Sequence, residues 1–308
     1  MDEIIGLAAN ESSESIPSSL MIDEVQRIHR FISDHPIGSR NKCHAWVRCL
    51  RWQLGSRLLN GPVIMPWLGG SCLVVERGMT GATGNLYCGL HEFADMALVL
   101  HYFSNASGSF VDVGANIGSY TILASKVCGA STIAIEPLPS TFERLKRNLA
   151  ANGIGGSVEA HCAAAGSAAG TICFSSDRDT MNQVVDESYK GPAVTVPVNT
   201  LDNLLSGRRA GFWKVDVEGF EREVLKGASK SLNDPFLEIV LLEGNDDFIS
   251  STMQHSGFAM RNYNPFTREL IAPDADAATS NHVWVRESED LCGRLRRAPK
   301  RIVYGVEF

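Results

Sequence analysis

The sequence lacks a surplus of positive charge, a long apolar run and a secretory leader. Its 308 residues contain 28 Lys and Arg against 35 Asp and Glu, giving a net charge of −7. That balance argues against a general nucleic-acid-binding surface, because neutralising phosphates needs excess cations. No window holds the roughly 18 uninterrupted apolar residues of a membrane-spanning helix. Because the N-terminus, MDEIIGLAANESSES, is acidic where a signal would be basic, we expect a cytoplasmic protein.

The eight cysteines are scattered and include no C-x-x-C pair. Disulfide scaffolds are typical of much shorter secreted chains, and a zinc site needs Cys and His ligands at short spacings that are missing here. We therefore expect reduced cysteines, mostly small buried hydrophobic residues, and no metal. The 44% hydrophobic and 20% charged residues are typical of a globular rather than a disordered chain.

Hydrophobic periodicity divides the chain into four parts. Residues 1–19, rich in Ser and Glu, are expected to form a mobile tail. Residues 20–105 are predicted to form a helical N-terminal extension or lid, residues 106–290 the main domain, and residues 291–308, with RLRRAPKR, a basic C-terminal tail. Within the extension we predict helices from Met21 and from Lys42 to about Asn60, short strands between Val63 and Tyr87, and a helix from Phe93 to Phe103.

From Ser109 onward, short buried strands alternate with helical segments, which predicts a parallel sheet covered by helices on both faces. The predicted strands are Phe110–Val113, Thr132–Ile135, Val158–His161, Phe212–Val217, Leu237–Leu242 and His282–Val285. Helices are predicted at 119–128, 140–152, 220–232 and 246–256. Residues 168–200 interrupt this alternation with two further strands, TICF and VTVPV, that either shape a pocket or extend the sheet.

The strongest local signal is FVDVGANIGSYT at residues 110–121, a strand followed by a Gly-containing turn and a helix start. Open α/β sheets bind ligands at the carboxyl ends of their strands. Glu136 ends the next strand, where a carboxylate can accept hydrogen bonds from both ribose hydroxyls. The middle glycine of the dinucleotide fingerprint is missing, and Asp112 would repel a pyrophosphate but attract an ammonium group. The pattern therefore favours S-adenosylmethionine over a dinucleotide.

Five motifs, in order, resemble the FkbM family of S-adenosylmethionine-dependent methyltransferases: DVGANIGSYT, IEPLPSTFERLKRNLAANG, CAAAG, VPVNTLDNLL and KVDVEGFEREVLKGA. The resemblance spans about residues 87–244, and YCGLHEFAD at 87–95 is similar to the segment before the family's first motif. It implies an α/β, class I methyltransferase (Rossmann-like) fold, with a seven-stranded, mostly parallel sheet, one antiparallel strand and helices on both faces. It also implies O-methylation, typically of a sugar or polyketide hydroxyl.

The resemblance further implies which residues bind the cofactor. The methionine part would contact Asp112, Gly114, Ala115, Asn116 and Gly118, the ribose would contact Glu136, and the adenine would lie by Pro137, Ala163 and Ala164. His91 and Glu92, placed before the first motif, would either close over the cofactor or acceptor or form the N-terminal turn of a helix. The turn CAAAG departs from the family pattern, because it has no polar side chain for the adenine amino group beyond a thiol; main-chain groups or Ser167 would have to serve.

Methyl transfer to an alcohol requires in-line positioning of the acceptor and a group that takes the hydroxyl proton. Asp216 is the first candidate base, because it lies at the end of the fourth predicted strand, at the sheet's carboxyl edge, and Glu218 is the second. The alternative is that D-V-E-G-F-E only caps the helix that follows. Lys214 and Lys226 are predicted to be surface charges.

We therefore predict an S-adenosylmethionine-dependent O-methyltransferase that acts on a hydroxyl of a carbohydrate or glycosylated secondary metabolite. Its partners would be a small-molecule or glycan acceptor, with no nucleic acid. A NAD(P)-dependent nucleotide-sugar oxidoreductase and a non-catalytic S-adenosylmethionine-binding module remain as alternatives. The basic C-terminal tail either makes weak contact with a membrane surface or is merely solvated. The N-terminal helices either cover the sheet domain or pair with a second subunit in a homo-oligomer.

Overall fold

The computed structural model describes residues 18–59, 61–77, 79–104, 108–175, 189–273 and 281–308. Of the tail expected at 1–19, residues 1–17 lie outside these ranges, and the first helix begins at Ser18. Within the described residues, no helix combines the length and apolarity needed to cross a membrane. The cytoplasmic location stays a prediction.

An eight-stranded sheet forms the centre of the molecule, in the order β12-β11-β13-β10-β9-β3-β4-β5. Its strands are β3 (Ser109–Val113), β4 (Ser131–Ile135), β5 (Val158–His161), β9 (Phe212–Val215), β10 (Ile239–Glu243), β11 (Ala259–Asn264), β12 (Glu269–Ile271) and β13 (Asn281–Val285). The strands from β5 to β10 are parallel, and β13 runs antiparallel to both its neighbours. The predicted doubly covered, mostly parallel sheet is confirmed, with β12 added beyond the seven strands expected.

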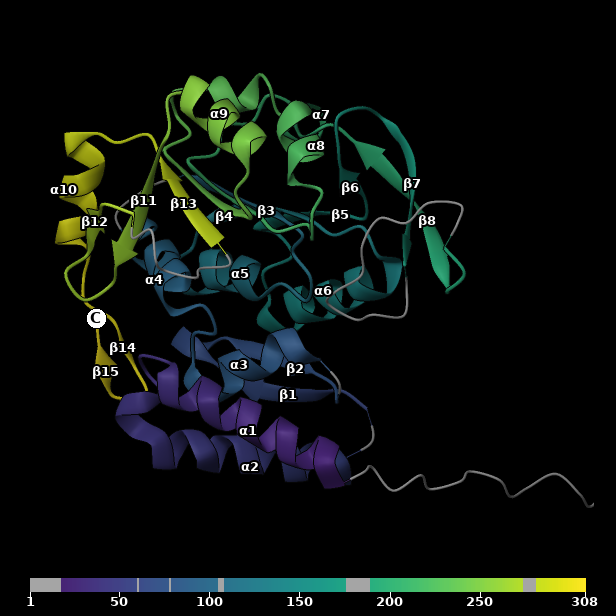
Figure 1. Ribbon diagram of the computed structural model, residues 1–308, viewed down its shortest axis with the longest axis vertical. Coiled ribbons are helices and arrows are strands. Elements are labelled where there is room, and N and C mark those ends of the chain that lie inside the picture. Colours follow the sequence, from purple (N-terminus) through teal and green to yellow (C-terminus); the bar gives the residue numbers. More distant parts are fainter. Residues whose placement is uncertain (1–17, 60, 78, 105–107, 176–188, 274–280) are drawn as a thin grey trace, which may run out of the picture.

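Both faces of this sheet are buried, which explains why its strands are continuous apolar runs. Phe110 and Phe212 are paired across β3 and β9 and belong to the core under α4 (Phe93–Tyr102), α5 (Ser119–Ile122) and α6 (Pro139–Asn152). The next pair, Val111 and Trp213, faces α7 (Leu201–Leu205), α8 (Glu221–Lys226) and α9 (Asp247–His255) on the other side (Figure 1). A π-helical turn at Leu123–Val127 continues α5.

The N-terminal extension forms a further layer against the helices of the first face (Figure 1). It consists of α1 (Ser18–Asp34), α2 (Lys42–Leu58), the hairpin β1 (Val63–Pro66) and β2 (Cys72–Val75), and α3 (Thr80–Cys88), with short 3-10 turns at Ser39–Asn41 and Leu68–Gly70. The prediction of strands up to Tyr87 is wrong after Val75. The Gly-containing segment 80–88 is helical because Ala82, Asn85 and Leu86, at helical spacing, are buried together.

Two asparagines of α6 attach the hairpin to the sheet domain. Asn148 Oδ1 accepts from the Val74 amide at 2.7 Å, and Asn152 Oδ1 accepts from the Cys72 amide at 2.9 Å. Their amide groups donate back to the carbonyls of the same two residues. The free edge of β2 is thereby paired by side chains rather than by another strand.

The C-terminal residues 291–308 are folded, which corrects the expectation of a basic tail. Helix α10 (Glu289–Arg297) is capped by Ser288, whose hydroxyl accepts from the Leu291 amide, and it is followed by the hairpin β14 (Ile302–Val303) and β15 (Val306–Glu307). Phe308 is 1% exposed and packs edge-on against Phe93. Arg294 and Arg296 are ion-paired with carboxylates of the body. A contact with a membrane surface stays a prediction.

The two strands of the insertion at 168–200 do not extend the main sheet but form a separate three-stranded sheet with β6 (Ala164–Ala165), which precedes the insertion. Its order is β6, β8 (Ala193–Asn199) and β7 (Gly170–Ser175), so both predicted strands are present. The sheet lies beyond the end of β5 (Figure 1), and Phe174 on β7 faces the cavity described next. A 3-10 turn at Ser231–Asn233 follows α8.

Candidate active site

A cavity of about 220 Å³ opens at the carboxyl ends of β3, β4 and β9. Most of the residues that the sequence singled out line it: Glu92, Asp112, Gly114, Ala115, Asn116, Glu136, Pro137, Ala163, Ala164, Asp216 and Glu218. Cys162 and Ser167, which the sequence analysis offered for the adenine, are not among the lining residues. Gly118 does not line it. With φ of +92°, it begins α5, and a Cβ there would come within 2.5 Å of the Leu145 side chain.

The turn after β3 passes between the ends of two neighbouring strands. The amides of Gly114 and Ala115 both donate to the Ile135 carbonyl of β4, at 2.9 and 3.0 Å. Gly114 has φ of +79°, and a Cβ would stand 1.8 Å from the Asp216 carbonyl oxygen. Only glycine fits here, since both the backbone angle and the neighbouring backbone exclude a side chain.

Asp112 is the inner carboxylate of the cavity, with 1% of its surface exposed. Its Oδ2 accepts a hydrogen bond from the Thr121 hydroxyl at 2.6 Å. Burial raises the pKa of Asp112, against the opposing effects of the Lys214 ammonium and Thr121. The site therefore holds a carboxylate that a further positive charge or donor would stabilise.

Glu136 is the second buried carboxylate, 5% exposed at the end of β4. Its two oxygens accept from the amides of Asn116 and Leu138, each at 3.0 Å. Burial raises the pKa of Glu136 to about 7, although both amide donors act in the opposite direction. The two hydrogen bonds fix the carboxylate's orientation and leave one lone pair on each oxygen for further donors.

Lys214 is buried rather than on the surface as predicted, and the sequence analysis did not select it as a site residue. It lines the cavity, is 4% exposed, and its Nζ lies 2.5 Å from Asp216 Oδ2 and 4.8 Å from the centre of the Tyr120 ring. Burial lowers the pKa of Lys214, but the surrounding carboxylates, led by Asp216, outweigh this and raise it above the ordinary value. The signal was available: a single Lys stands within the buried strand FWKV.

Glu92 belongs to a buried network that spans the cavity. It accepts from the Tyr120 hydroxyl at 2.7 Å and from the Asn281 amide at 2.9 Å. The same amide donates to Asp95 at 3.0 Å. Burial, with the neighbouring Glu92 adding to it, raises the pKa of Asp95 to about 7. Glu92 is therefore held in place from β13 and α5, far apart in sequence.

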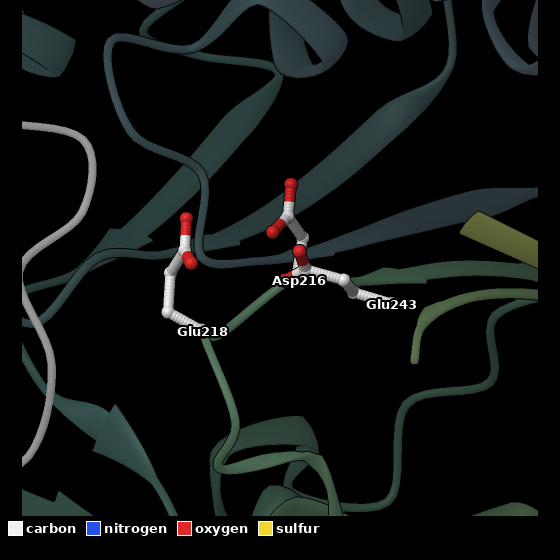
Figure 2. A group of neighbouring side chains, drawn as sticks. All are labelled: Asp216, Glu218 and Glu243. Carbon is white, nitrogen blue, oxygen red and sulfur yellow. The ribbon is translucent and has the colours of Figure 1, made fainter. Parts of the chain in front are cut away.

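Three carboxylates gather where β9 and β10 end, as Figure 2 shows for Asp216, Glu218 and Glu243. One oxygen from each lies within 4.8 Å of the others, close enough for a single cation to contact all three. The sequence reasoning missed Glu243. Burial and the adjacent Asp216 raise the pKa of Glu243 to about 8.

Asp216 and Glu218 differ in their electrostatics. Burial raises the pKa of Asp216, but Lys214 and the Glu243 carboxyl group more than compensate and hold it below the ordinary value. Burial, Asp216 and Glu221 raise the pKa of Glu218 instead. Neither caps the following helix, which begins at Glu221 and has no side-chain cap. Glu221 instead accepts from the loop amides of Val217 and Gly219, at 3.3 and 3.1 Å. Glu218 has φ of +52°, an unusual conformation for a non-glycine residue that lines a cavity.

The opposite end of the cavity is apolar. Pro137, Ala163 and Ala164 line it together with Phe174 and Phe220, two rings that the sequence analysis did not select. These side chains form a surface suited to a flat, weakly polar ring system. The cavity thus combines an acidic end and an apolar end at the edge of a parallel sheet.

The fold and this cavity define a class of protein. Five parallel strands with an antiparallel strand inserted beside β10, and a cavity at the carboxyl ends of β3, β4 and β9, make a Rossmann-like, class I methyltransferase architecture. The family model of the methyltransferase FkbM domain matches residues 112–266, half of the chain. The chain belongs to the FkbM methyltransferase family and is a methyltransferase, which removes the basis for the oxidoreductase alternative.

The chain is similar to named methyltransferases over part of its length. It is 28% identical over 179 residues to Methyltransferase 1 of Beauveria bassiana, covering 49% of this chain and 72% of that protein. It is 34% identical over 139 residues to the hexuronic acid methyltransferase AglP of Haloferax volcanii, covering 44% and 56%. A solved putative transferase of Pyrococcus horikoshii aligns over 74% of this chain and 71% of its own, at 15% identity and a TM-score of 0.42. The fold assignment rests on the sheet's own strand order.

Proposed function

We propose that this methyltransferase uses S-adenosylmethionine to methylate a hydroxyl group of a carbohydrate or of a glycosylated secondary metabolite. The observation that carries the proposal is the pair of buried carboxylates, Asp112 and Glu136, which open on one cavity at adjacent strand ends. The pKa of each carboxylate is raised, because the neighbouring cation and hydrogen-bond donors offset only part of the effect of burial. An ammonium group and two ribose hydroxyls would supply the missing charge and donors, so the residues fit this cofactor.

In this proposal, Asp112 and the turn at 114–116 hold the aminoacyl end and Glu136 holds the ribose. The apolar end, with Pro137 and Ala163, receives the adenine. Contact with Phe174 and Phe220 would replace the polar side chain that the CAAAG turn lacks. The cofactor would supply an activated methyl group, leaving the protein to orient the acceptor and to accept a proton.

Asp216 and Glu218 are the proposed proton acceptors. The sequence analysis placed Asp216 first, whereas the pKa shifts favour Glu218. The pKa of Asp216 is lowered by its ion pair with Lys214, so it is the weaker base. The pKa of Glu218 is raised, which brings it closer to neutral pH and makes it the better acceptor for a hydroxyl proton. We assign Asp216 to orienting Lys214 and the acceptor, and Glu218 to accepting the proton.

A carbohydrate acceptor is supported by the similarity to a protein named for hexuronic acid methylation. Since that similarity covers 56% of the relative, the acceptor itself must be found by experiment. The purified protein is incubated with S-adenosylmethionine and a panel of glycosides, and methylated products are detected by mass spectrometry. Product formation excludes the non-catalytic binding module.

Binding of the cofactor is tested separately by calorimetric titration with S-adenosylhomocysteine and with NAD. We expect the adenosyl ligand alone to bind. Asp112→Asn and Glu136→Gln should each weaken it tenfold or more, whereas Glu143→Gln, an exposed carboxylate paired with Lys146, should not. Binding of NAD alone, or full affinity in both site variants, would overturn the proposal. Glu218→Gln should lower turnover about a hundredfold with little change in cofactor affinity.

A further inference from the structure

A second cavity, of about 440 Å³, lies in the N-terminal layer between α1, α2 and α3. The three helices lie together, next to the helices that cover one face of the central sheet (Figure 1). Nothing in the chemistry described so far uses this cavity. It lies outside the segment matched by the family model, which begins at residue 112.

The charge of the second cavity is opposite to that of the first. Arg27, Arg57 and Arg77 line it, and none of the described Asp and Glu residues does. Arg57 donates to the backbone and side-chain oxygens of Gln53, both neutral acceptors. The side chains of Arg27 and Arg77 form no hydrogen bond or ion pair with other residues of the described part of the chain. Three guanidinium groups with no carboxylate partner among the described residues, in a chain of net charge −7, have the chemistry that an anion requires.

Three aromatic side chains also line this cavity. Phe31 from α1, Trp52 from α2 and Tyr87 from α3 line it, and Trp52 and Tyr87 are 5% and 3% exposed. Their rings are held rigidly by the core and offer apolar faces beside charged groups. A ligand with an apolar face and an anionic substituent matches this combination, as a sugar ring with a carboxylate or phosphate does.

His91 connects the two cavities, because it lines both. Its ring packs on Gly84, where a Cβ would come within 2.3 Å of His91 Nδ1, and its edge meets Phe31 with 5.3 Å between the ring centres. The His91 amide donates to Asn85 Oδ1 at 2.8 Å, and Asn85 lines the first cavity. A molecule bound in the second cavity can therefore contact a side chain that also borders the site assigned to the methyl donor.

We propose that the second cavity is the acceptor-binding site and that it selects a glycosyl acceptor bearing a carboxylate or a phosphate, whose hydroxyl reaches the first cavity past His91. The inference rests on the proposed methyl-transfer function and names its substrate class. The arginines hold the anionic group and the aromatic rings hold the sugar face. The negative charges of the first cavity would repel the same anion, which keeps the acceptor in one orientation.

The test measures acceptor binding in the absence of any methyl donor, so that its outcome does not depend on methyl transfer. The intact protein is titrated by ligand-observed NMR with 4-nitrophenyl β-glucuronide, with glucose 6-phosphate and with the neutral 4-nitrophenyl β-glucoside. We expect the glucuronide, the phosphate or both to bind, and more weakly as salt is raised. Which of the two binds identifies the anionic group.

Two matched double variants locate the site. Arg27→Gln with Arg57→Gln removes one lining arginine from each of α1 and α2, and Arg30→Gln with Arg51→Gln removes one non-lining arginine from the same two helices. The first pair should weaken anion binding at least tenfold, and the control pair should not. S-adenosylhomocysteine affinity should be unchanged in both, which shows that the fold and the first cavity are intact.

Several outcomes would overturn the inference. They are equal affinity for the neutral glucoside and the anions, no anion binding at all, or equal loss in the two double variants. If anions bind as expected but S-adenosylhomocysteine does not, the proposed function fails while the anion site stands. If methylated neutral glycosides are found without anion binding, the function stands and this site assignment fails.

Discussion

The titration of Glu136 links the pH of the solution to nucleoside binding. Its pKa is raised from 4.5 to about 7, chiefly by burial. Only the ionised form accepts hydrogen bonds from both ribose hydroxyls while also accepting from the Asn116 and Leu138 amides. With a pKa near 7, about 3% is ionised at pH 5.5 and about 97% at pH 8.5, so affinity should rise about thirtyfold between these values.

The free energy of unfolding of the unliganded protein should change with pH in the direction opposite to nucleoside affinity. Because the folded-state pKa exceeds the unfolded one, the folded protein binds more protons between pH 4.5 and 7. The free energy of unfolding should therefore fall as pH rises through this window, by roughly 3 kcal/mol at most from Glu136. Raising the pH thus weakens the free protein while strengthening its complex with a nucleoside.

The assay uses 5′-deoxy-5′-methylthioadenosine, which has the ribose hydroxyls but no ammonium group and so does not report on Asp112. Its dissociation constant is measured by calorimetry at half-unit steps from pH 5.5 to 8.5. Glu136→Gln should bind more weakly and show no such slope, and Glu143→Gln should follow the unmodified protein. A flat profile in the unmodified protein, or the same slope in Glu136→Gln, would refute the assigned role of Glu136.

Further predictions concern the turn, the buried cation and the carboxylate cluster. In urea melts, Gly114→Ala should lower the free energy of unfolding by about 3 kcal/mol more than Gly129→Ala. Both glycines have φ near +80°, but only a Cβ at position 114 would meet a backbone carbonyl. Equal losses in the two variants would contradict this. Lys214→Met should lower the free energy of unfolding by about 3–5 kcal/mol at pH 8, because it leaves Asp216 without its cation. The loss should be smaller at pH 5, where the Asp216 carboxyl takes up a proton. Lys146→Met, at an exposed ion pair, is the control. Methyl transfer should persist in EDTA, since Lys214 already supplies a cation at Asp216; loss restored by Mg²⁺ would show that the three carboxylates bind metal.

The sequence by itself determined the central sheet and the location of the first cavity. Buried strands on both faces must be apolar throughout, so runs such as Phe110–Val113 were recognisable without any tertiary information. The turn at Gly114 and the carboxylate of Glu136 follow two such strands directly, and parallel strands end at the same edge. Their positions directly after parallel strands therefore predicted that these residues lie close together, and in the structure they line one cavity.

Only the tertiary structure decided the roles of charged and amphipathic segments. Lys214 stands in an apolar strand, which indicates its burial but not its pairing with Asp216. Nothing in the sequence around Arg27 indicates that it lines a cavity between helices. Segment 291–308 looked like a basic tail because its charges were counted without their partners, whereas Arg294 pairs with Glu238 and Phe308 is buried. Such roles depend on contacts between residues distant in sequence, which periodicity does not encode. Burial of those contacts sets the protonation of each group, and with it the chemistry that each cavity can perform.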